Sequence, residues 1–436
     1  MKFKLTNSEK RWVLYDVGNS AFTLLISTIM PIYFNYLAGN AGLSSVDYLA
    51  YWGYGASIAT LVVAMLGPVF GAIADTKGFK KPVFAGSLLI GAISCICLGF
   101  AKQWLVFLAI YIIAKIGYSC SLIFYDSMLP DITTADRVDN VSSQGFAWGY
   151  IGSCIPFVIS LGLVLGAETM GISMETAMML SFIIIAVWWV AMSMPLIKGY
   201  RQKYYVEKKK HAVSESFKRL GRTFGSMRKN KKIFIFLLAF FFYIDGVYTI
   251  IDMATAYGQA LGLDSTGLLL ALLVTQIVAF PFAIIFGRLA QRFRTNKLIT
   301  ICITAYFGIA VFAMFLTTQE QFWGLAVLVG MFQGGIQALS RSYFTKIIPP
   351  EQSGEYFGLF DICGKGASFM GTTVVSLVSQ LTGDISKGVG MIAVLFVVGI
   401  ILFQVAVRTE ENEDAYNSQA GKREETYNGC RISDVM

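Results

Sequence analysis

Ionisable side chains inside long apolar runs are the residues of this sequence best placed to do chemistry. Asp245, Thr249 and Asp252 are spaced by four and three residues, so they share one face of a helix. Asp245 lies about 18 Å into its run, where a carboxylate is costly unless it faces a cavity or a partner. It is therefore a candidate for proton exchange, with Tyr243 as a neighbouring aromatic residue. Lys115 lies at a similar depth, where it could bind an anionic group of a solute or neutralise Asp245.

A polar stripe follows the first apolar run. Asp16, Ser20, Thr23 and Ser27 recur at steps of four, three and four residues, and Asn19 borders them. The stripe could line a solute pathway or form hydrogen bonds between helices. Because Asp16 lies barely one turn into the run, we expect it at a gate or an interface between helices.

Two further runs contain charges near one end. Asp361 and Lys365 are spaced i, i+4, so they could neutralise each other or, for Lys365, neutralise Asp245. Gln337 and Arg341 lie on one helix face, with Gln337 a candidate for solute binding. We expect Arg341 to pair with Asp361 or Asp16 at a gate.

The elements that position these residues are predicted from hydropathy. Apolar residues make up 56% of the 436-residue chain and charged residues only 14%, which is too little charge for a water-soluble surface. The apolar runs are continuous rather than alternating, so they indicate membrane-spanning helices and not a barrel. The sequence therefore predicts an all-α polytopic membrane protein with twelve spans, near 12–38, 47–74, 82–101, 104–129, 143–166, 175–197, 233–258, 266–287, 297–317, 321–345, 355–381 and 388–408.

Basic residues are distributed unevenly between the two sides. Of the 35 Lys and Arg residues, only Lys102 and Lys387 fall in the connections after the odd-numbered spans. The positive-inside rule then predicts that both termini are cytoplasmic. We expect the protein in the cytoplasmic membrane of the cell.

The chain divides into two halves of six spans each. We predict an N-terminal six-helix bundle over 1–198, a basic cytoplasmic linker over 199–232, a C-terminal six-helix bundle over 233–408 and a polar cytoplasmic tail over 409–436. The basic linker is expected to meet anionic lipid headgroups rather than nucleic acid. The polar, net acidic tail is expected to be disordered.

Catalytic and metal-binding patterns are missing from the sequence. The single histidine, His211, falls in the linker, and the seven cysteines accompany no ligand-like spacing. The sequence holds neither an H-E-x-x-H motif nor a phosphate-binding G-x-x-x-x-G-K-[ST] loop. We therefore expect no metal, no cofactor, no enzymatic activity and no direct use of ATP.

A loop pattern occurs once in each half. Glycine, a polar residue four positions later and basic residues beyond recur in register at 71–81 and 287–297. The first copy resembles the G-x-x-x-D-x-x-G-R-K loop motif of the major facilitator superfamily. That resemblance implies two pseudo-symmetric bundles, with Asp75 facing the N-terminus of a helix from the other half and Lys80 and Lys81 holding the loop. Such contacts would form a cytoplasmic gate.

Further local matches resemble the vacuole-effluxer-like branch of that superfamily, whose fungal members export amino acids from the vacuole. They are found at 15–22, 124–131, 243–246, 334–342 and 355–366. The resemblance implies a monomeric secondary transporter of small solutes, amino acids being favoured, that works by alternating access. Because no span contains histidine, proton coupling would have to use carboxylates. A non-transporting receptor with a transporter fold is the alternative.

Three positions depart from that branch. Asp126 stands where relatives often have Asn, Ile244 replaces an Asn that commonly precedes the aspartate, and Tyr248 replaces a common Gln. These positions lie on candidate pocket helices, so the solute need not be that of the fungal relatives.

Overall fold

The computed structural model describes residues 3–207 and 230–433, and helices dominate both parts. The first run is a single membrane-length segment interrupted by one short π-helix, Leu25–Ile29. The helices of the first half are α1 Asn7–Leu24, α2 Met30–Asn40, α3 Ser45–Ala74, α4 Lys80–Leu98, α5 Trp104–Ser127, α6 Leu129–Ile132, α7 Val138–Leu165 and α8 Met174–Gly199.

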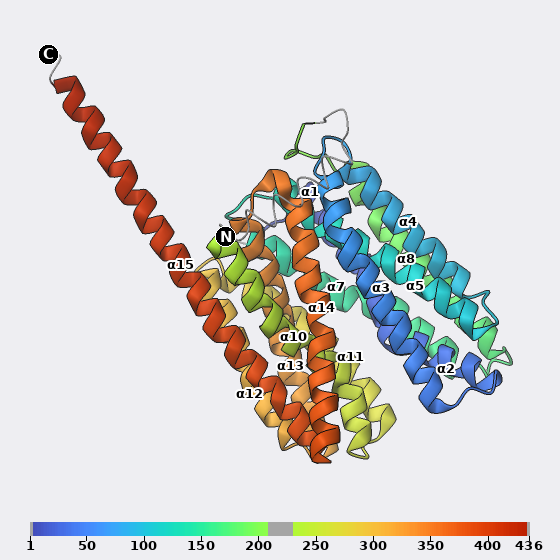
Figure 1. Cartoon of the computed structure of the whole chain (residues 1–436). Coiled ribbons are helices and arrows are strands. Elements are labelled where there is room, and N and C mark those ends of the chain that lie inside the picture. Colours follow the sequence, from blue (N-terminus) through green and yellow to red (C-terminus); the bar gives the residue numbers. More distant parts are fainter. Residues whose placement is uncertain (1–2, 208–229, 434–436) are drawn as a thin grey trace.

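The second half repeats this helical pattern. Its helices are α10 Lys231–Ala260, α11 Ser265–Leu289, α12 Thr295–Met314, α13 Gln319–Ile347, α14 Ser353–Thr382 and α15 Ile385–Ser433, with a 3-10 turn at Pro350–Gln352. Figure 1 shows α15 running far past the other helices. The expectation of a disordered tail is therefore wrong for 409–433, which continue the last helix without interruption.

The predicted spans correspond one by one to these helices. Within the described residues, eleven helical segments are long and apolar enough to cross a membrane. The twelfth predicted span corresponds to α14, whose 30 residues give ample length. Large apolar side chains such as Ile93, Leu105 and Ile401 are exposed on the helix surfaces, as a lipid-facing protein requires.

Two hairpins in equivalent places show that the halves repeat each other. Gly42, before α3, and Gly262, before α11, both have a φ of 76°. In each, the residue after the glycine donates its N–H to a carbonyl five residues back at 3.0 Å, which ends the preceding helix in a left-handed turn. Ser44 and Asp264 then cap the next helix through their side chains.

Four pairs of helices make the main contacts between the halves among the described residues. α3 packs against α14, while α7 packs against α11 and α13. α5 also contacts α14. Figure 1 shows the blue-to-green helices of the first half beside the yellow-to-red helices of the second.

Candidate functional site

Two glycines allow the backbones of α3 and α14 to touch. A Cβ on Gly71 would lie 2.1 Å from the carbonyl oxygen of Gly354, and a Cβ on Gly354 would lie 2.4 Å from that of Gly71. One turn further along, Gly358 meets Pro68 in the same way. Small residues spaced by four on α14 thus build a close helix crossing, which we call the α3–α14 seam.

Asp75 caps the first turn of α14 from the opposite half. Its two carboxylate oxygens accept the backbone N–H groups of Gly354 at 2.7 Å and Glu355 at 3.0 Å. These N–H groups have no partner within the helix, and the helix dipole favours a negative charge there. This is the geometry that the loop motif predicts for Asp75.

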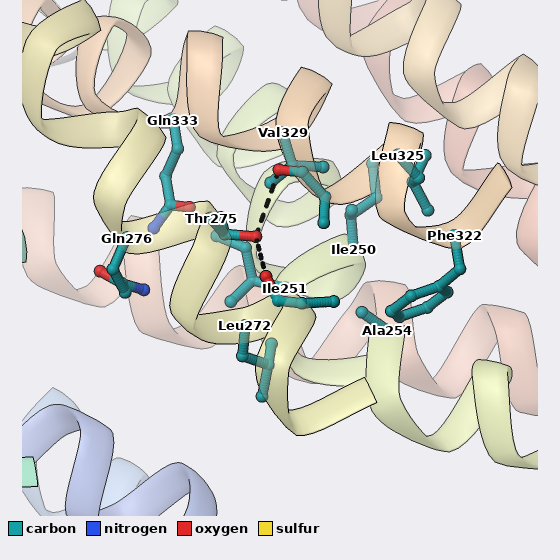
Figure 2. Close-up of a pocket in the computed structure, with 12 residues that line it drawn as sticks. Ile250, Ile251, Ala254, Leu272, Thr275, Gln276, Phe322, Leu325, Val329 and Gln333 are labelled. Atoms are coloured by element: carbon teal, nitrogen blue, oxygen red, sulfur yellow. Dashed lines mark hydrogen bonds between the residues drawn. The ribbon is translucent and has the colours of Figure 1, made fainter. Parts of the chain in front are cut away.

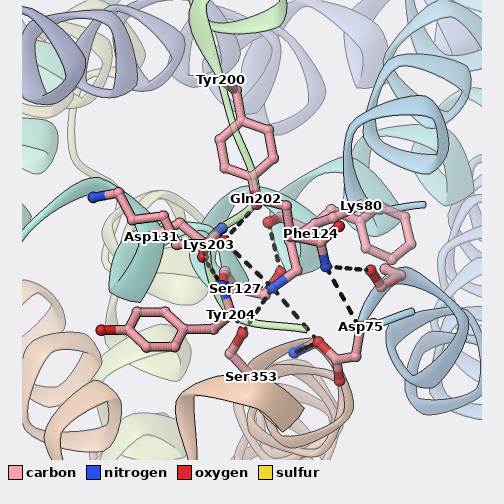
Figure 3. A network of polar contacts seen from close by, with 12 residues as sticks. Asp75, Lys80, Phe124, Ser127, Asp131, Tyr200, Gln202, Lys203, Tyr204 and Ser353 are labelled. Carbon is pink, nitrogen blue, oxygen red and sulfur yellow. Dashed lines mark hydrogen bonds and ion pairs between the residues drawn. The ribbon is translucent and has the colours of Figure 1, made fainter. Parts of the chain in front are cut away.

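Lys80 is fully buried and joins the two halves beside that cap. Its ammonium donates to Ser353 Oγ of α14 at 2.8 Å and to the carbonyl of Ser127 at 3.2 Å. It also lies 3.5 Å from Asp75 and 3.7 Å from Asp131. Figure 3 shows these groups converging on one point.

The segment after α8 packs against the same loop. Asp131 accepts the hydroxyl of Tyr200 and the backbone N–H groups of Lys203 and Tyr204, each of the latter at 2.9 Å. Gln202 donates to the carbonyl of Ala74 at 3.2 Å (Figure 3). A single β-bridge between Thr76 and Val206 completes the strap, which we define as residues 200–207.

The second half forms a related contact with different residues. Gly287 of α11 packs on Ser143 of α7, where a Cβ would lie 2.7 Å from the serine Cβ. Asp139 of α7 then accepts the hydroxyls of Thr295 at 2.9 Å and Ser342 at 2.6 Å. Lys346 forms an ion pair with the same carboxylate, so both halves contribute charge to this end.

Arg341 of α13 reaches into the first half. Its guanidinium donates to Asp126 at 2.9 Å and to Asp16 at 3.3 Å. Its Nε donates to Ser142 Oγ at 2.9 Å. With 2% of its surface exposed, Arg341 is a buried ion-pair partner for helices α1 and α5, and Asp16 rather than Asp361 is its partner.

Aromatic rings and amides complete this ion-pair site. The guanidinium carbon lies 4.7 Å from the ring centre of Trp12 and 4.2 Å from that of Phe146, which is cation–π geometry. Tyr125 donates to Asp16 at 2.7 Å, and Asn19 donates to it at 3.2 Å. Asn19 therefore orients the carboxylate.

Asp245 is enclosed within the second half. Its side chain is fully buried, and its Oδ1 accepts the backbone N–H of Gly371 at 2.9 Å and the hydroxyl of Thr249 at 3.2 Å. Its Oδ2 has no hydrogen-bond partner among the described residues. Neither Lys115 nor any other described cation pairs with it.

Polar side chains are exposed where the halves face each other. Thr23 of α1 and Ser27 of the π-helix that follows it are exposed, and Thr23 shares a hydrogen bond of 2.6 Å with Tyr118 of α5. Asp252 of α10 is also exposed and lies within electrostatic range of Tyr111 on α5. Asp252 of α10 and Tyr111 of α5 thus lie near each other at the boundary between the halves.

Two further predicted residues lie near that boundary. The ammonium of Lys115, which is half-buried, lies 5.9 Å from the ring centre of Tyr111. Gln337 of α13 accepts the hydroxyl of Tyr150 from α7 at 2.6 Å. These contacts place a cation and an amide beside the interface between halves.

A small hollow lies within the second half between α10, α11 and α13. Thr275 donates to the carbonyls of Ala271 and Ala326, while Gln333 Oε1 has no partner among the described residues. Figure 2 shows Gln276 and Gln333 at one end of the hollow and apolar side chains at the other. The residues that line it are Ile250, Ile251, Ala254, Ala271, Leu272, Thr275, Gln276, Phe322, Leu325, Ala326, Val329 and Gln333.

Comparison with known sequences decides the family. A family model described as "Vacuole effluxer Atg22 like" matches residues 7–415. YxiO, an MFS-type transporter of Bacillus subtilis strain 168, is 45% identical over 407 residues, which cover 92% of this chain and 95% of the relative. The chain belongs to the vacuole effluxer Atg22-like family.

More distant comparisons agree with that assignment. Autophagy-related protein 22 of Saccharomyces cerevisiae strain S288c is 23% identical over 468 residues, covering 88% of each chain. The MFS transporter FucP, solved in the outward conformation, has a TM-score of 0.69 at 15% identity and covers 92% of this chain and 97% of that one. A bacterial homologue of ferroportin has a TM-score of 0.65 at 15% identity, covering 92% and 98%. The Atg22-like chain therefore has the major facilitator fold and is a multi-pass membrane transporter.

Some predicted residues of this Atg22-like transporter do not join the polar contacts between halves. Tyr243 is fully buried, and its hydroxyl shares a hydrogen bond with Ser340 of the same half. Lys81 is half-buried and forms no ion pair among the described residues. Asp361, by contrast, is half-buried on α14 and lies within electrostatic range of Asp126 and Tyr118 of the first half. The side chain of Lys365 lies outside the described residues.

Sequence reasoning missed several polar residues of the Atg22-like transporter. In the sequence, Asp126 stands out only because relatives often have Asn at this position, although it pairs with Arg341. Asp131, Asp139 and Lys346 lie at span ends, where charged residues are common and give no signal of their own. A serine such as Ser142 is equally inconspicuous in sequence.

Proposed function

We propose that this chain is a secondary active transporter of the cytoplasmic membrane that works by alternating access. One observation carries the proposal: the polar contacts that cross between halves gather at the end that bears the basic connections. There Asp75 caps α14, Lys80 bonds Ser353, and Lys346 pairs with Asp139. In this conformation the transporter is closed toward the cytoplasm, because the predicted orientation places that end inside the cell.

The proposed solute is a small zwitterion such as an amino acid. Support comes from the family description as a vacuole effluxer and from the charges that border the space between halves. Lys115 lies on the first half and the exposed Asp252 on the second, so opposite charges of a solute have groups of opposite sign on either side.

Flux into proteoliposomes tests this function. The purified chain is reconstituted and exposed to a mixed pool of metabolites that includes all common amino acids, with and without an imposed pH gradient. We expect saturable uptake or efflux of at least one zwitterionic solute, with a rate that changes with the gradient. Protein-free liposomes serve as the control. Saturable binding without translocation of any solute would instead indicate a receptor with a transporter fold.

A further inference from the structure

We propose that Asp245 binds the coupling proton and that α14 transmits its protonation state to the α3–α14 seam through Gly371. This inference rests on the proposed transport function and names the residue that would couple it to protons. Three features support it: the enclosed carboxyl group of Asp245 on α10, its contact with Gly371, and the position of Gly371 on α14, the helix that closes the seam.

The carboxyl group of Asp245 has fewer partners than an anion needs. Its Oδ1 accepts two hydrogen bonds, from Gly371 N and Thr249 Oγ1, while its Oδ2 is buried without a hydrogen-bond partner among the described residues. An isolated carboxylate in such surroundings is very costly, whereas a neutral carboxyl group is tolerated. The closed conformation therefore requires a proton on Oδ2.

Among the described residues, no charged group interacts with Asp245. On its own helix, Tyr248 is a neutral phenol and Asp252 is exposed.

Charged residues on α14 lie at a distance from this site. Asp361 lies ten residues before Gly371, about 15 Å along the helix axis, and Lys365 lies six residues before it, about 9 Å along the axis. The described interactions of Asp245 are confined to Gly371 and Thr249, so its charge state depends on protons and water.

Gly371 is where α14 meets this carboxyl group. A Cβ there would lie 2.1 Å from Thr249 Oγ1 and 2.5 Å from Asp245 Oδ1. Only a residue without a side chain allows the backbone N–H of α14 to reach the carboxyl group so closely. The contact therefore depends on α10 and α14 being pressed together at this point.

Helix α14 carries both Gly371, which contacts Asp245, and the glycines of the seam. Gly354, whose N–H binds Asp75, precedes Gly371 on α14 by seventeen residues, about 25 Å along the helix. When the proton leaves Oδ2 for water, the remaining carboxylate needs hydration, so α10 and α14 must separate at Gly371. That movement of α14 withdraws its first turn from Asp75. Protonated Asp245 thus favours the closed seam, and deprotonation favours an open one.

Infrared spectroscopy tests the proton itself. The reconstituted full chain is compared with Asp245→Asn and, as a matched control on the same helix, Asp252→Asn. We expect a carbonyl band of a protonated carboxylic acid that disappears in Asp245→Asn, remains in Asp252→Asn, and is lost from the wild type as pH rises. A band that is unchanged in Asp245→Asn would overturn the proposal.

Distance measurements test the coupling without any solute. Spin labels on Thr134→Cys and Glu351→Cys, which are exposed on opposite halves near the seam, are introduced into a variant that lacks the native cysteines. We expect the distance between the labels to lengthen with rising pH in the wild type and in Asp252→Asn, and to stay short at every pH in Asp245→Asn. A pH response that persists in Asp245→Asn would contradict the coupling.

A second variant distinguishes the proposed coupling from simple misfolding. Gly371→Ala forces α10 and α14 apart, so we expect long label distances at every pH, the opposite of Asp245→Asn. Equal behaviour of the two variants would overturn the proposed link. The spin-label distances are measured without a solute. A negative flux screen would therefore count against the transport function but would not affect the distance measurement.

Discussion

At the scale of single residues, Arg341 illustrates how one side chain ties the halves together. It carries a buried positive charge from α13 to Asp126 and Asp16 on the other half. Buried ion pairs contribute little net stability, but removing one partner leaves the others uncompensated. The role of Arg341 is therefore to make the closed arrangement specific.

We expect Arg341→Ala to destabilise the folded protein by about 3–5 kcal/mol, because Asp16 and Asp126 would remain buried without their cation. Thermal unfolding in detergent would measure the loss. Arg288→Ala, which removes an exposed arginine of the same half, should change stability little. The triple variant Arg341→Gln, Asp16→Asn and Asp126→Asn removes all three charges and should recover part of the lost stability. If the triple variant is as unstable as Arg341→Ala, the uncompensated charges are not the cause.

Asp75 makes a different kind of contact, because its partners are backbone N–H groups at a helix terminus. We expect Asp75→Asn to weaken the closed state, since an amide keeps at most one acceptor and no negative charge for the first turn of α14. Hydrogen exchange at Gly354 and Glu355 should quicken at least severalfold. Exchange that is as slow as in the wild type would contradict this role, and Asp136→Asn, an exposed aspartate, serves as the control.

At the scale of elements, the α3–α14 seam depends on backbone contact. We expect Gly71→Ala to open it, because the added Cβ would lie 2.1 Å from the carbonyl oxygen of Gly354. Gly86→Ala on α4 is the matched control, since its Cβ would meet no atom within 4 Å. Spin-label distances across the seam would measure the effect, and equal distances in both variants would contradict this account.

The strap after α8 is a second element with a testable contribution. Tyr200→Phe removes the hydroxyl that donates to Asp131, and we expect a loss of about 1 kcal/mol, the usual value of one hydrogen bond. Thermal unfolding would measure it. Tyr204→Phe, whose ring is exposed, should be neutral, and an equal loss in both variants would indicate that the hydroxyl contact to Asp131 is unimportant.

At the scale of the whole molecule, the closed end implies access from the opposite side. We expect Thr23→Cys and Ser27→Cys, at exposed positions, to react with a membrane-impermeant thiol reagent added outside intact cells. Ser142→Cys, which is fully buried, should not react. The variants are made without native cysteines, because Cys97 is exposed. Reaction of Thr23→Cys only from the cytoplasmic side would reverse the proposed orientation.

The sequence by itself determined the spans and much of the first gate contact. Helices in lipid must satisfy their backbone groups internally, so hydropathy and length give the twelve spans without knowledge of neighbours. The resemblance of the loop at 71–81 to the superfamily motif implied that Asp75 faces a helix terminus of the other half, and Asp75 accepts the backbone N–H of Gly354 there.

Only the tertiary structure decided which charges meet. The choice of Asp16 and Asp126 for Arg341, and the absence of a described cation beside Asp245, depend on how helices far apart in sequence are rotated and brought together. Helical periodicity places Asp245, Thr249 and Asp252 on one face but does not say that Gly371 covers the first and leaves the last exposed. Spacing along one helix fixes a face, whereas the partner of that face is set by packing across the chain.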